Sequence, residues 1–291
     1  MRRAYPTWFA GGALALYAVF VLLPGVLGLG FSFTDWSSYP GDLHWVGFDN
    51  YAAILDPSSA YFGAIENTVL FTVATIFLKT VIALGLAVLL TSGVRRFAYL
   101  YRAFIYLPAV LPILIVGIVF KSILNPEGGL LNGSLELVGL GGLAQRWLTD
   151  VALALWSVIG VDTWKGVGYI MVILIAGVQA ISRDYYEAAS IDGATGWQAF
   201  RYITLPLLKP VLAVTTVLNL LYGLRVFDIV FVLTNGGPGY ATETVYTSMW
   251  EMFGLGQWGL ATALSTLFFV VMIGLSYFVL RAMRQSTVPE Q

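Results

Sequence analysis

The sequence contains no cysteine and a single histidine, His44, among 291 residues. The absence of cysteine excludes disulfides, iron–sulfur clusters, thiolate metal sites and cysteine nucleophiles. A single histidine excludes a multi-histidine metal site, so we expect neither a metal site nor catalytic residues here. Charged residues make up only 11% of the chain and the formal net charge is −1. The charge balance therefore gives no indication of a basic surface that would bind nucleic acid.

The chain is unusually rich in apolar residues. They make up 58% of the sequence, and the mean hydropathy is +0.81. Soluble domains, in contrast, have about 45–50% apolar and about 25% charged residues. This composition predicts an all-α integral membrane protein, with one membrane domain over residues 1–291. Because a crossing helix needs about 20 apolar residues, six stretches qualify. They are about 8–32, 67–91, 104–120, 152–180, 211–233 and 257–280.

The third predicted span is short and contains Pro108 and Pro112. We expect it to be kinked or to continue into 121–124.

Basic residues are distributed unevenly between the predicted spans. One group of segments comprises the N-terminus, 92–103, 181–210 and the tail after 280. It contains ten basic residues: Arg2, Arg3, Arg95, Arg96, Arg102, Arg183, Arg201, Lys209, Arg281 and Arg284. The other segments, 33–66, 121–151 and 234–256, contain only Lys121 and Arg146. Because basic loops remain in the cytoplasm, we predict that the first group is cytoplasmic and that both termini lie there.

The predicted cytoplasmic segment 181–210 is much longer than a simple connection requires. Asp184 is followed three residues later by Glu187, a capping pattern that predicts a short helix as far as Ile191. Gly193 then predicts a break, because glycine tolerates the left-handed conformation that ends many helices.

A second capping pattern follows the break. Thr195 and Gln198 predict a capping box and a second short helix that ends at Ile203, before Pro206 and Pro210. A helix, a bend and a helix at the cytoplasmic face can serve two roles. The pair can dock a cytoplasmic partner, or it can lie on the lipid headgroups as an amphipathic element; the residues alone leave both open.

A family resemblance is carried by the residues of this segment. The matching positions are Glu187-Ala188-Ala189, Asp192-Gly193-Ala194, Phe200, Ile203, Leu205-Pro206 and Pro210. They resemble the EAA loop of ABC-importer permeases, at the spacing of that family. Further matches are Tyr106-Leu107-Pro108 with Pro112, Asn125-Pro126-Glu127-Gly128-Gly129, Trp164-Lys165-Gly166-Val167-Gly168, Phe227-Asp228 and Gly236-Gly237-Pro238. Over most of its length the chain resembles the binding-protein-dependent sugar permeases of the maltose and glycerol-phosphate type.

This resemblance implies a type I ABC-importer permease fold with six transmembrane helices. It implies a multi-pass subunit of a bacterial or archaeal plasma (inner) membrane that forms half of the pathway for a carbohydrate. The implied partners are a second permease subunit in a heterodimer, cytoplasmic ATP-binding subunits and an extracytoplasmic solute-binding protein. ATP and Mg would be bound by the partner ATPase, with no cofactor in this chain. The residues implied to couple to the ATPase are Glu187, Ala188, Ala189, Asp192, Gly193 and Ala194.

No GxxxxGK[ST] phosphate loop occurs in the sequence. The glycine-rich run Gly236-Gly237-Pro238-Gly239 is not followed by a lysine. We therefore expect this chain to be a transporter subunit rather than an enzyme, with its energy supplied by a partner.

Five ionisable residues fall within the predicted spans: Lys79, Asp162, Lys165, Arg225 and Asp228. Each is costly in hydrocarbon unless it is paired or faces water. Asp162 and Lys165 are three residues apart, as are Arg225 and Asp228, so each couple can share one helix face. These charges either fix helix packing as internal ion pairs or line a hydrophilic cavity for a polyol.

Aromatic side chains, on which sugar rings commonly stack, lie near these charges in the sequence: Trp164, Tyr169, Tyr222 and Phe227. The candidates for the substrate path are Lys79, Asp162, Trp164, Lys165, Tyr222, Arg225, Phe227 and Asp228.

Two other functions compete with the importer hypothesis. A stand-alone, ion-coupled secondary transporter of a small polar solute would leave the patterned segment 181–210 unexplained. It would also need a coupling carboxylate without a basic neighbour, whereas Asp162 and Asp228 each have one three residues away. A membrane enzyme would need histidine or acidic clusters that the sequence does not offer.

Overall fold

The computed structural model describes residues 9–93 and 96–286. Over these residues the secondary structure is helical apart from one isolated β-bridge, between Thr34 and Trp45. Five helices are long and apolar enough to cross a membrane, and a bent pair brings the number to six if it is one crossing. The predicted all-α membrane fold is confirmed. The start of the first predicted span at residue 8 and the basic residues Arg2, Arg3 and Arg95 lie outside the described residues.

Two compact units make up the structure. The first comprises residues up to Phe62 together with Ser248–Ser276. Its helices are α1 (Phe9–Tyr17), the π-helical turn η1 (Ala18–Leu22), α2 (Leu23–Phe31), α3 (Asp49–Leu55), the larger part of α13 (Val245–Gly254) and the larger part of α14 (Trp258–Ser286). The first three form one apolar helix, Phe9–Phe31.

In this first unit, the chain after α2 is fixed by aromatic stacking. The Trp36 ring lies 4.3 Å from that of Phe31 and 4.9 Å from that of Trp258, between ring centroids. The Gly259 amide donates to the Trp36 carbonyl at 2.7 Å. A side chain at Gly259 would overlap the Thr34 carbonyl, so glycine permits this close approach.

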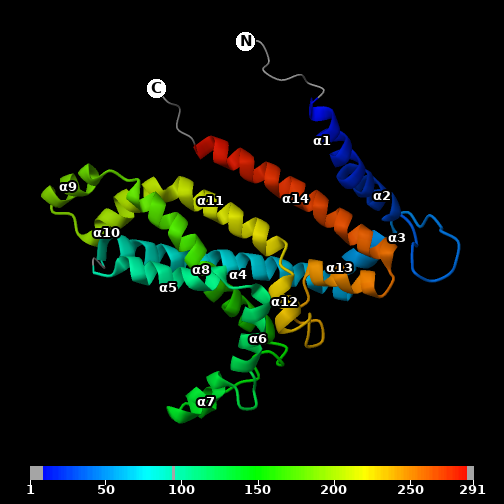
Figure 1. The fold of residues 1–291 in the computed structure, drawn as a ribbon, viewed down its shortest axis with the longest axis horizontal. Helices are drawn as coiled ribbons and strands as arrows, with labels where there is room; N and C mark the ends of the chain where they lie inside the picture. Colours follow the sequence, from blue (N-terminus) through cyan, green and yellow to red (C-terminus); the bar gives the residue numbers. More distant parts are fainter. Residues whose placement is uncertain (1–8, 94–95, 287–291) are drawn as a thin grey trace. The chain divides into compact units, whose positions relative to one another are not determined.

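The second unit comprises Gly63–Thr247 and the chain from Tyr277. Its helices are α4 (Ala60–Val88), η2 (Leu89–Gly93), α5 (Ala98–Val110), α6 (Ile113–Ile123), α7 (Leu130–Leu137), η3 (Gly141–Leu143), α8 (Ala154–Gln179), α9 (Arg183–Ile191), α10 (Gly196–Ala199), η4 (Phe200–Thr204), α11 (Leu205–Leu224), α12 (Asp228–Leu233) and the start of α13 (Val245–Gly254). Helix α8 is central: 61% of its most apolar stretch is buried, against 28% for the span that contains α4 and 22% for the one that contains α11. It packs against α5 and α11 (Figure 1).

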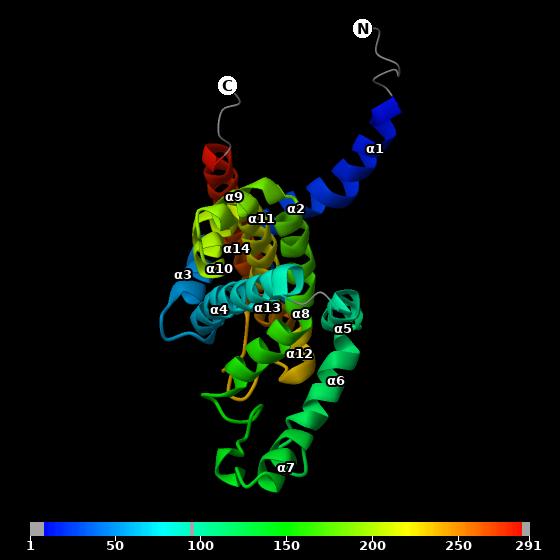
Figure 2. The same ribbon diagram turned by 90° about the vertical axis from the view of Figure 1, so that its left-hand side faces the viewer.

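The third predicted span is sharply bent. Helices α5 and α6 meet at 96° across Leu111 and Pro112 (Figure 2). Leu111 has extended backbone angles, φ −66° and ψ 137°, because the residue before a proline is pushed out of the helical region. The predicted kink is confirmed, and α6 does continue past residue 120, to Ile123.

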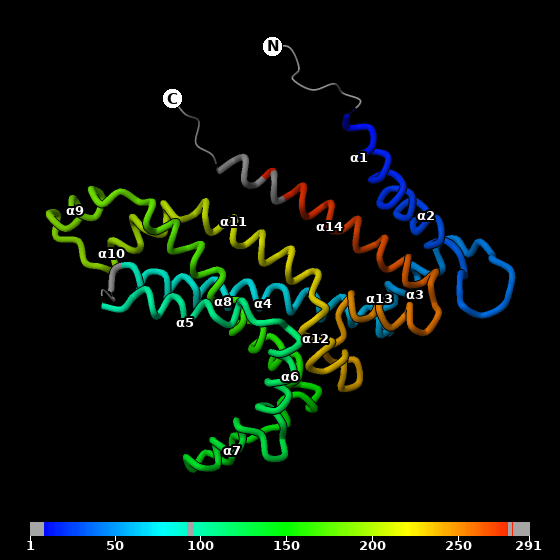
Figure 3. Tube along the Cα trace, in the orientation of Figure 1, coloured from blue at the N-terminus to red at the C-terminus, as the bar shows by residue number. Residues whose placement is uncertain are grey.

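The fifth span differs from the prediction at both ends. One uninterrupted helix runs from Gly196 to Leu224 (Figure 3), so the predicted helix end at Ile203 is wrong, and the helix that contains the predicted fifth span begins before residue 211. Pro206 is tolerated because it lies in the first turn of α11, directly after the π-helical turn η4, where the hydrogen-bond register has already shifted.

At its other end, the fifth span does not continue to 233 as predicted. Helix α11 closes with short bonds from the Arg225 amide to Tyr222 and from the Val226 amide to Gly223. Such i→i−3 bonds tighten the last turn and end the α-helical ladder. Helix α12 then begins separately at Asp228.

Candidate functional site

A polar stripe runs along α4 inside an otherwise apolar helix. Thr68, Thr72, Thr75 and Lys79 are all buried, and their spacing places them on one face. The three threonine hydroxyls donate to carbonyls of the preceding turn at 2.7–2.8 Å. Lys79 is thus the member of the stripe that needs a partner from another helix.

That partner is Asp162 of α8. The Lys79 Nζ lies 2.6 Å from Asp162 Oδ2, and the two side chains are 4% and 2% exposed. Tyr222 of α11 donates its hydroxyl to Asp162 Oδ1 at 2.8 Å, and its ring centroid lies 4.6 Å from Lys79 Nζ. Both carboxylate oxygens are therefore engaged from other helices, and Lys165, three residues further along α8, is not the ion-pair partner of Asp162.

Two glycines of α8 make room for this arrangement. A Cβ on Gly166 would lie 2.7 Å from Lys79 Cε, so the lysine side chain passes over the bare backbone there. A Cβ on Gly168 would overlap the Ile105 carbonyl and lie 2.8 Å from Tyr106 Cα, so α5 approaches α8 through that glycine. Glycine is therefore required at positions 166 and 168 because neighbouring atoms occupy the space of a side chain there.

A cavity of about 210 Å³ adjoins the ion pair. Side chains from α4, α5, α8 and α11 line it, among them Lys79, Tyr106, Asp162, Lys165, Tyr169, Asn219 and Tyr222. Four of the eight predicted substrate-path residues therefore meet at one cavity: Lys79, Asp162, Lys165 and Tyr222.

The other four candidates do not line this cavity. The Trp164 ring packs against Phe120 of α6, with centroids 5.0 Å apart. The Phe227 ring stacks on Phe231 at 5.1 Å. Arg225 and Asp228 fall on either side of the break between α11 and α12.

Because the helix breaks there, the prediction that Arg225 and Asp228 can share one helix face is wrong. Within the described residues, no ion pair joins them.

Tyr106 and Asn219 were not among the predicted site residues. Asn219 is the single carboxamide in the stretch 211–233, and with Thr215 and Tyr222 it follows a helical i, i+4, i+7 pattern. A polar stripe of this kind within an apolar span could have identified Asn219 as a candidate site residue from the sequence. Nothing comparable marks Tyr106, whose place depends on the bend after α5.

The bent helix pair α9–α10 forms a second candidate site. The side chain of Ser182, rather than the predicted Asp184, caps α9, since its hydroxyl accepts the Asp184 amide. Gly193 has φ +77°, as the predicted break requires. The Ala194 amide donates to Ala189 and the Gly193 amide to Ser190, the two bonds of a Schellman C-cap.

Beyond the bend, the predicted capping box is confirmed: Thr195 and Gln198 satisfy each other's backbone amides. The Tyr186 hydroxyl lies 2.9 Å from that of Thr204, which ties α9 to the long helix. Of the six predicted coupling residues, Glu187, Ala188, Asp192 and Gly193 are exposed, and Ala189 and Ala194 are half-buried. Helix α9 thus has a fixed shape and an accessible surface.

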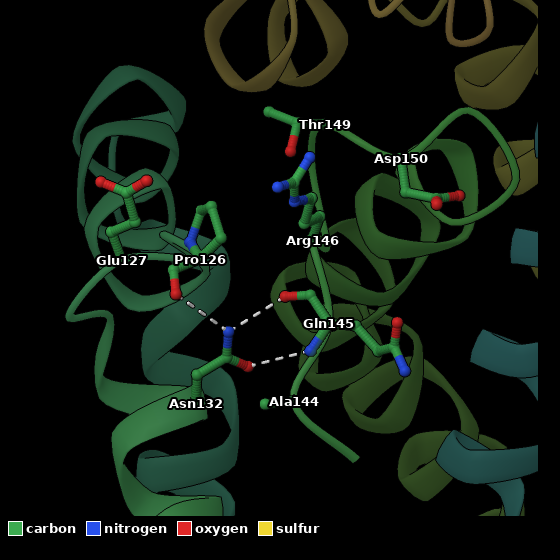
Figure 4. Close-up of a pocket in the computed structure, with 8 residues that line it drawn as sticks. All are labelled: Pro126, Glu127, Asn132, Ala144, Gln145, Arg146, Thr149 and Asp150. Carbon is green, nitrogen blue, oxygen red and sulfur yellow. Dashed lines mark hydrogen bonds between the residues drawn. The ribbon is translucent and has the colours of Figure 1, made fainter. Parts of the chain in front are cut away.

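A polar cleft of about 660 Å³ lies in the segment between α6 and α8 (Figure 4). Asn132, which is 6% exposed, donates to the carbonyls of Pro126 and Gln145, and its Oδ1 accepts the Trp147 indole N–H at 2.7 Å. Glu127, Arg146 and Asp150 line the cleft. Charges of both signs suit it to a polar partner surface.

Apolar crossing helices, a charged internal cavity and an exposed bent helix pair together define a membrane transport subunit. Residues 79–287 match the family "Binding-protein-dependent transport system inner membrane component", and the chain belongs to this family. The trehalose/maltose transport system permease protein MalF of Thermococcus litoralis is 34% identical over 277 residues, covering 93% of this chain and 90% of that protein.

Two solved structures agree with this family. A bacterial ABC transporter involved in the import of the acidic polysaccharide alginate aligns with a TM-score of 0.81 and 25% identity, over 95% of this chain and 94% of its own. A bacterial alginate ABC transporter in complex with an alginate pentasaccharide-bound periplasmic protein gives a TM-score of 0.78 and 25% identity, over 94% and 92%. The predicted resemblance and the predicted ABC-importer permease fold are confirmed.

Proposed function

We propose that this chain is the permease subunit of an ATP-driven, binding-protein-dependent carbohydrate importer, in which it forms half of the translocation pathway. Its family supports the transport class. The trehalose/maltose permease relative and the alginate transporters support a carbohydrate as the transported solute.

One observation carries the mechanism. The helix Gly196–Leu224 is uninterrupted, and it joins the bend at Gly193 to the cavity residues Asn219 and Tyr222. At about 1.5 Å per residue its 29 residues extend about 43 Å. A push on α9 is passed to this helix through the Tyr186–Thr204 contact, so movement at the bend reaches the cavity wall.

The push comes from a partner ATPase, which binds ATP and Mg, while this chain needs no cofactor and has no catalytic role. The coupling residues Glu187, Ala188, Ala189, Asp192, Gly193 and Ala194 form the docking surface. A second permease subunit completes the pathway. The excess of basic residues supports a cytoplasmic position for the bend and both termini.

On the opposite side of the membrane, an extracytoplasmic solute-binding protein delivers the carbohydrate. Its proposed docking surface on this chain is the cleft lined by Glu127, Arg146 and Asp150 (Figure 4). The membrane is the plasma membrane of a bacterium or an archaeon.

Mild-detergent purification of the chain from its own membranes, followed by mass spectrometry, tests this proposal. We expect a second membrane subunit and a nucleotide-binding subunit in a stable ratio, and solute uptake that stops when ATP is depleted. Purification of the chain alone, together with uptake that survives ATP depletion, would favour the ion-coupled secondary transporter instead.

A further inference from the structure

The charges that line the internal cavity do not cancel. Lys79 and Asp162 neutralise each other at 2.6 Å, and the second carboxylate oxygen is occupied by the Tyr222 hydroxyl. Both oxygens of the Asp162 carboxylate are thus engaged, and its side chain is only 2% exposed. The pair acts on the cavity as a neutral wall.

Lys165 supplies a charge that nothing neutralises. It is half-buried, and its Nζ donates to one carbonyl, that of Ala109, at 3.2 Å. Over the described part of the chain, no carboxylate lies within 4.0 Å of it. An ammonium group has three N–H donors, so Lys165 keeps donors and a full charge at the cavity.

Asn219 adds an uncommitted amide to the same cavity. Its side chain is 5% exposed, and its Nδ2 has no hydrogen-bond partner among the described residues. A buried amide donor without a partner costs free energy, which a bound acceptor would recover. The unused polar groups here are therefore an amide and a cation.

The remaining wall suits a sugar ring. Tyr106 and Tyr169 line the cavity with aromatic rings that are 37% and 46% exposed. The cavity volume of about 210 Å³ is that of roughly seven liquid water molecules, which is room for a single ring and its substituents.

Resting on the proposed function, we infer that this permease half selects acidic carbohydrates, with a sugar carboxylate received by the Lys165 ammonium and the Asn219 amide. A carboxylate only accepts hydrogen bonds and carries the complementary charge, so it satisfies both groups at once. A neutral hydroxyl leaves the lysine charge unmatched. Lys165 is a specificity-determining residue in this arrangement, and the Lys79–Asp162 pair prevents Asp162 from competing with the solute.

Two probes that differ at one group test the inference: methyl β-D-glucuronide, which has a carboxylate, and methyl β-D-glucoside, which has a hydroxymethyl group there. Each is titrated into the purified importer complex without nucleotide, and binding is followed by saturation-transfer NMR. We expect the glucuronide to bind about tenfold or more tightly than the glucoside. The Lys165→Gln complex should lose that preference, while Lys165→Arg should keep it.

Lys121→Gln is the matched control, since Lys121 is an exposed lysine on α6 that does not line the cavity. Equal binding of the two probes, a preference that survives Lys165→Gln, or no binding of either probe at millimolar concentration would overturn the inference. Failure of the proposed function is a separate result, because it shows as a chain that purifies without an ATPase subunit. An assembled, ATP-dependent importer that prefers the neutral probe would leave the function standing and remove only the acidic specificity.

Discussion

The buried cluster of Lys79, Asp162 and Tyr222 and the bend around Gly193 belong to the same unit but are held in opposite ways. Side chains from three helices fix the cluster, through one ion pair and one hydroxyl bond at 2.6 and 2.8 Å. The bend is fixed by backbone bonds of its C-cap and by the capping box that follows.

The two regions also differ in how far their side chains are exposed. In the cluster the charges are almost completely buried. Around the bend, Ile191, Trp197 and Tyr202 are 87%, 70% and 74% exposed. A region that keeps its shape through its backbone can leave its side chains free for a partner, whereas a charge in the interior must be matched internally. Substitutions that remove a charge should therefore disrupt the cluster, and substitutions that restrict the backbone conformation should disrupt the bend.

The largest effect is expected for Lys79→Met. It leaves the Asp162 carboxylate buried without its cation, and breaking a buried pair in this way costs about 3–5 kcal/mol. Thermal unfolding of the purified protein in detergent measures the loss. The double variant Lys79→Met/Asp162→Asn should lose less than the single one, because no uncompensated charge remains. Equal stability of Lys79→Met and the wild type would show that the pair is not needed for folding.

Gly168→Ala should have the next largest effect, because the new methyl group would overlap the Ile105 carbonyl and push α5 away from α8. Overpacking of this kind typically costs about 1–3 kcal/mol. Gly160→Ala on the same helix is the matched control, since nothing lies within 4 Å of its Cβ position. The same unfolding assay compares the two, and a loss as large in Gly160→Ala would point to a general sensitivity of α8 rather than to the close contact.

Gly193→Val tests the bend. Valine at φ +77° is strained by about 1–3 kcal/mol, so the C-cap should shift while the cluster stays intact. We expect the assembled complex to reach the membrane and hydrolyse ATP with less transport per ATP consumed. Gly196→Ala, at the ordinary helical start of α10 with open space around it, should remain coupled. Wild-type coupling in Gly193→Val would contradict the role proposed for the bend.

The bend could be predicted from the sequence because its signals are local. A glycine after a helical stretch and a threonine three residues before a glutamine each act within one turn, and both Gly193 and the Thr195–Gln198 box are found as predicted. The functional roles of these residues stay predictions.

The cluster could not be predicted, because its pairing depends on how separate helices align. The spacing along α8 placed Asp162 and Lys165 on one helix face, but it could not indicate that Lys79 of α4 is the ion-pair partner of Asp162. The end of the fifth span was missed for a related reason. The stretch 211–233 is apolar on average although it contains Arg225 and Asp228, so hydropathy does not reveal the break that the tight bonds to Tyr222 and Gly223 create.

The smallest effect is expected for Thr195→Ala, which removes the hydroxyl that accepts the Gln198 amide. Loss of such a cap costs about 1 kcal/mol, which corresponds to roughly fivefold faster opening. Hydrogen exchange of the amides in α10 should accelerate by that factor, while amides around Asp162 exchange as before. Ser190→Ala on α9 removes an exposed hydroxyl without a capping role and should leave α10 unchanged. Acceleration that spread to the cluster would mean that the two regions are not stabilised independently, and the contrast between backbone-held and side-chain-held regions would have to be given up.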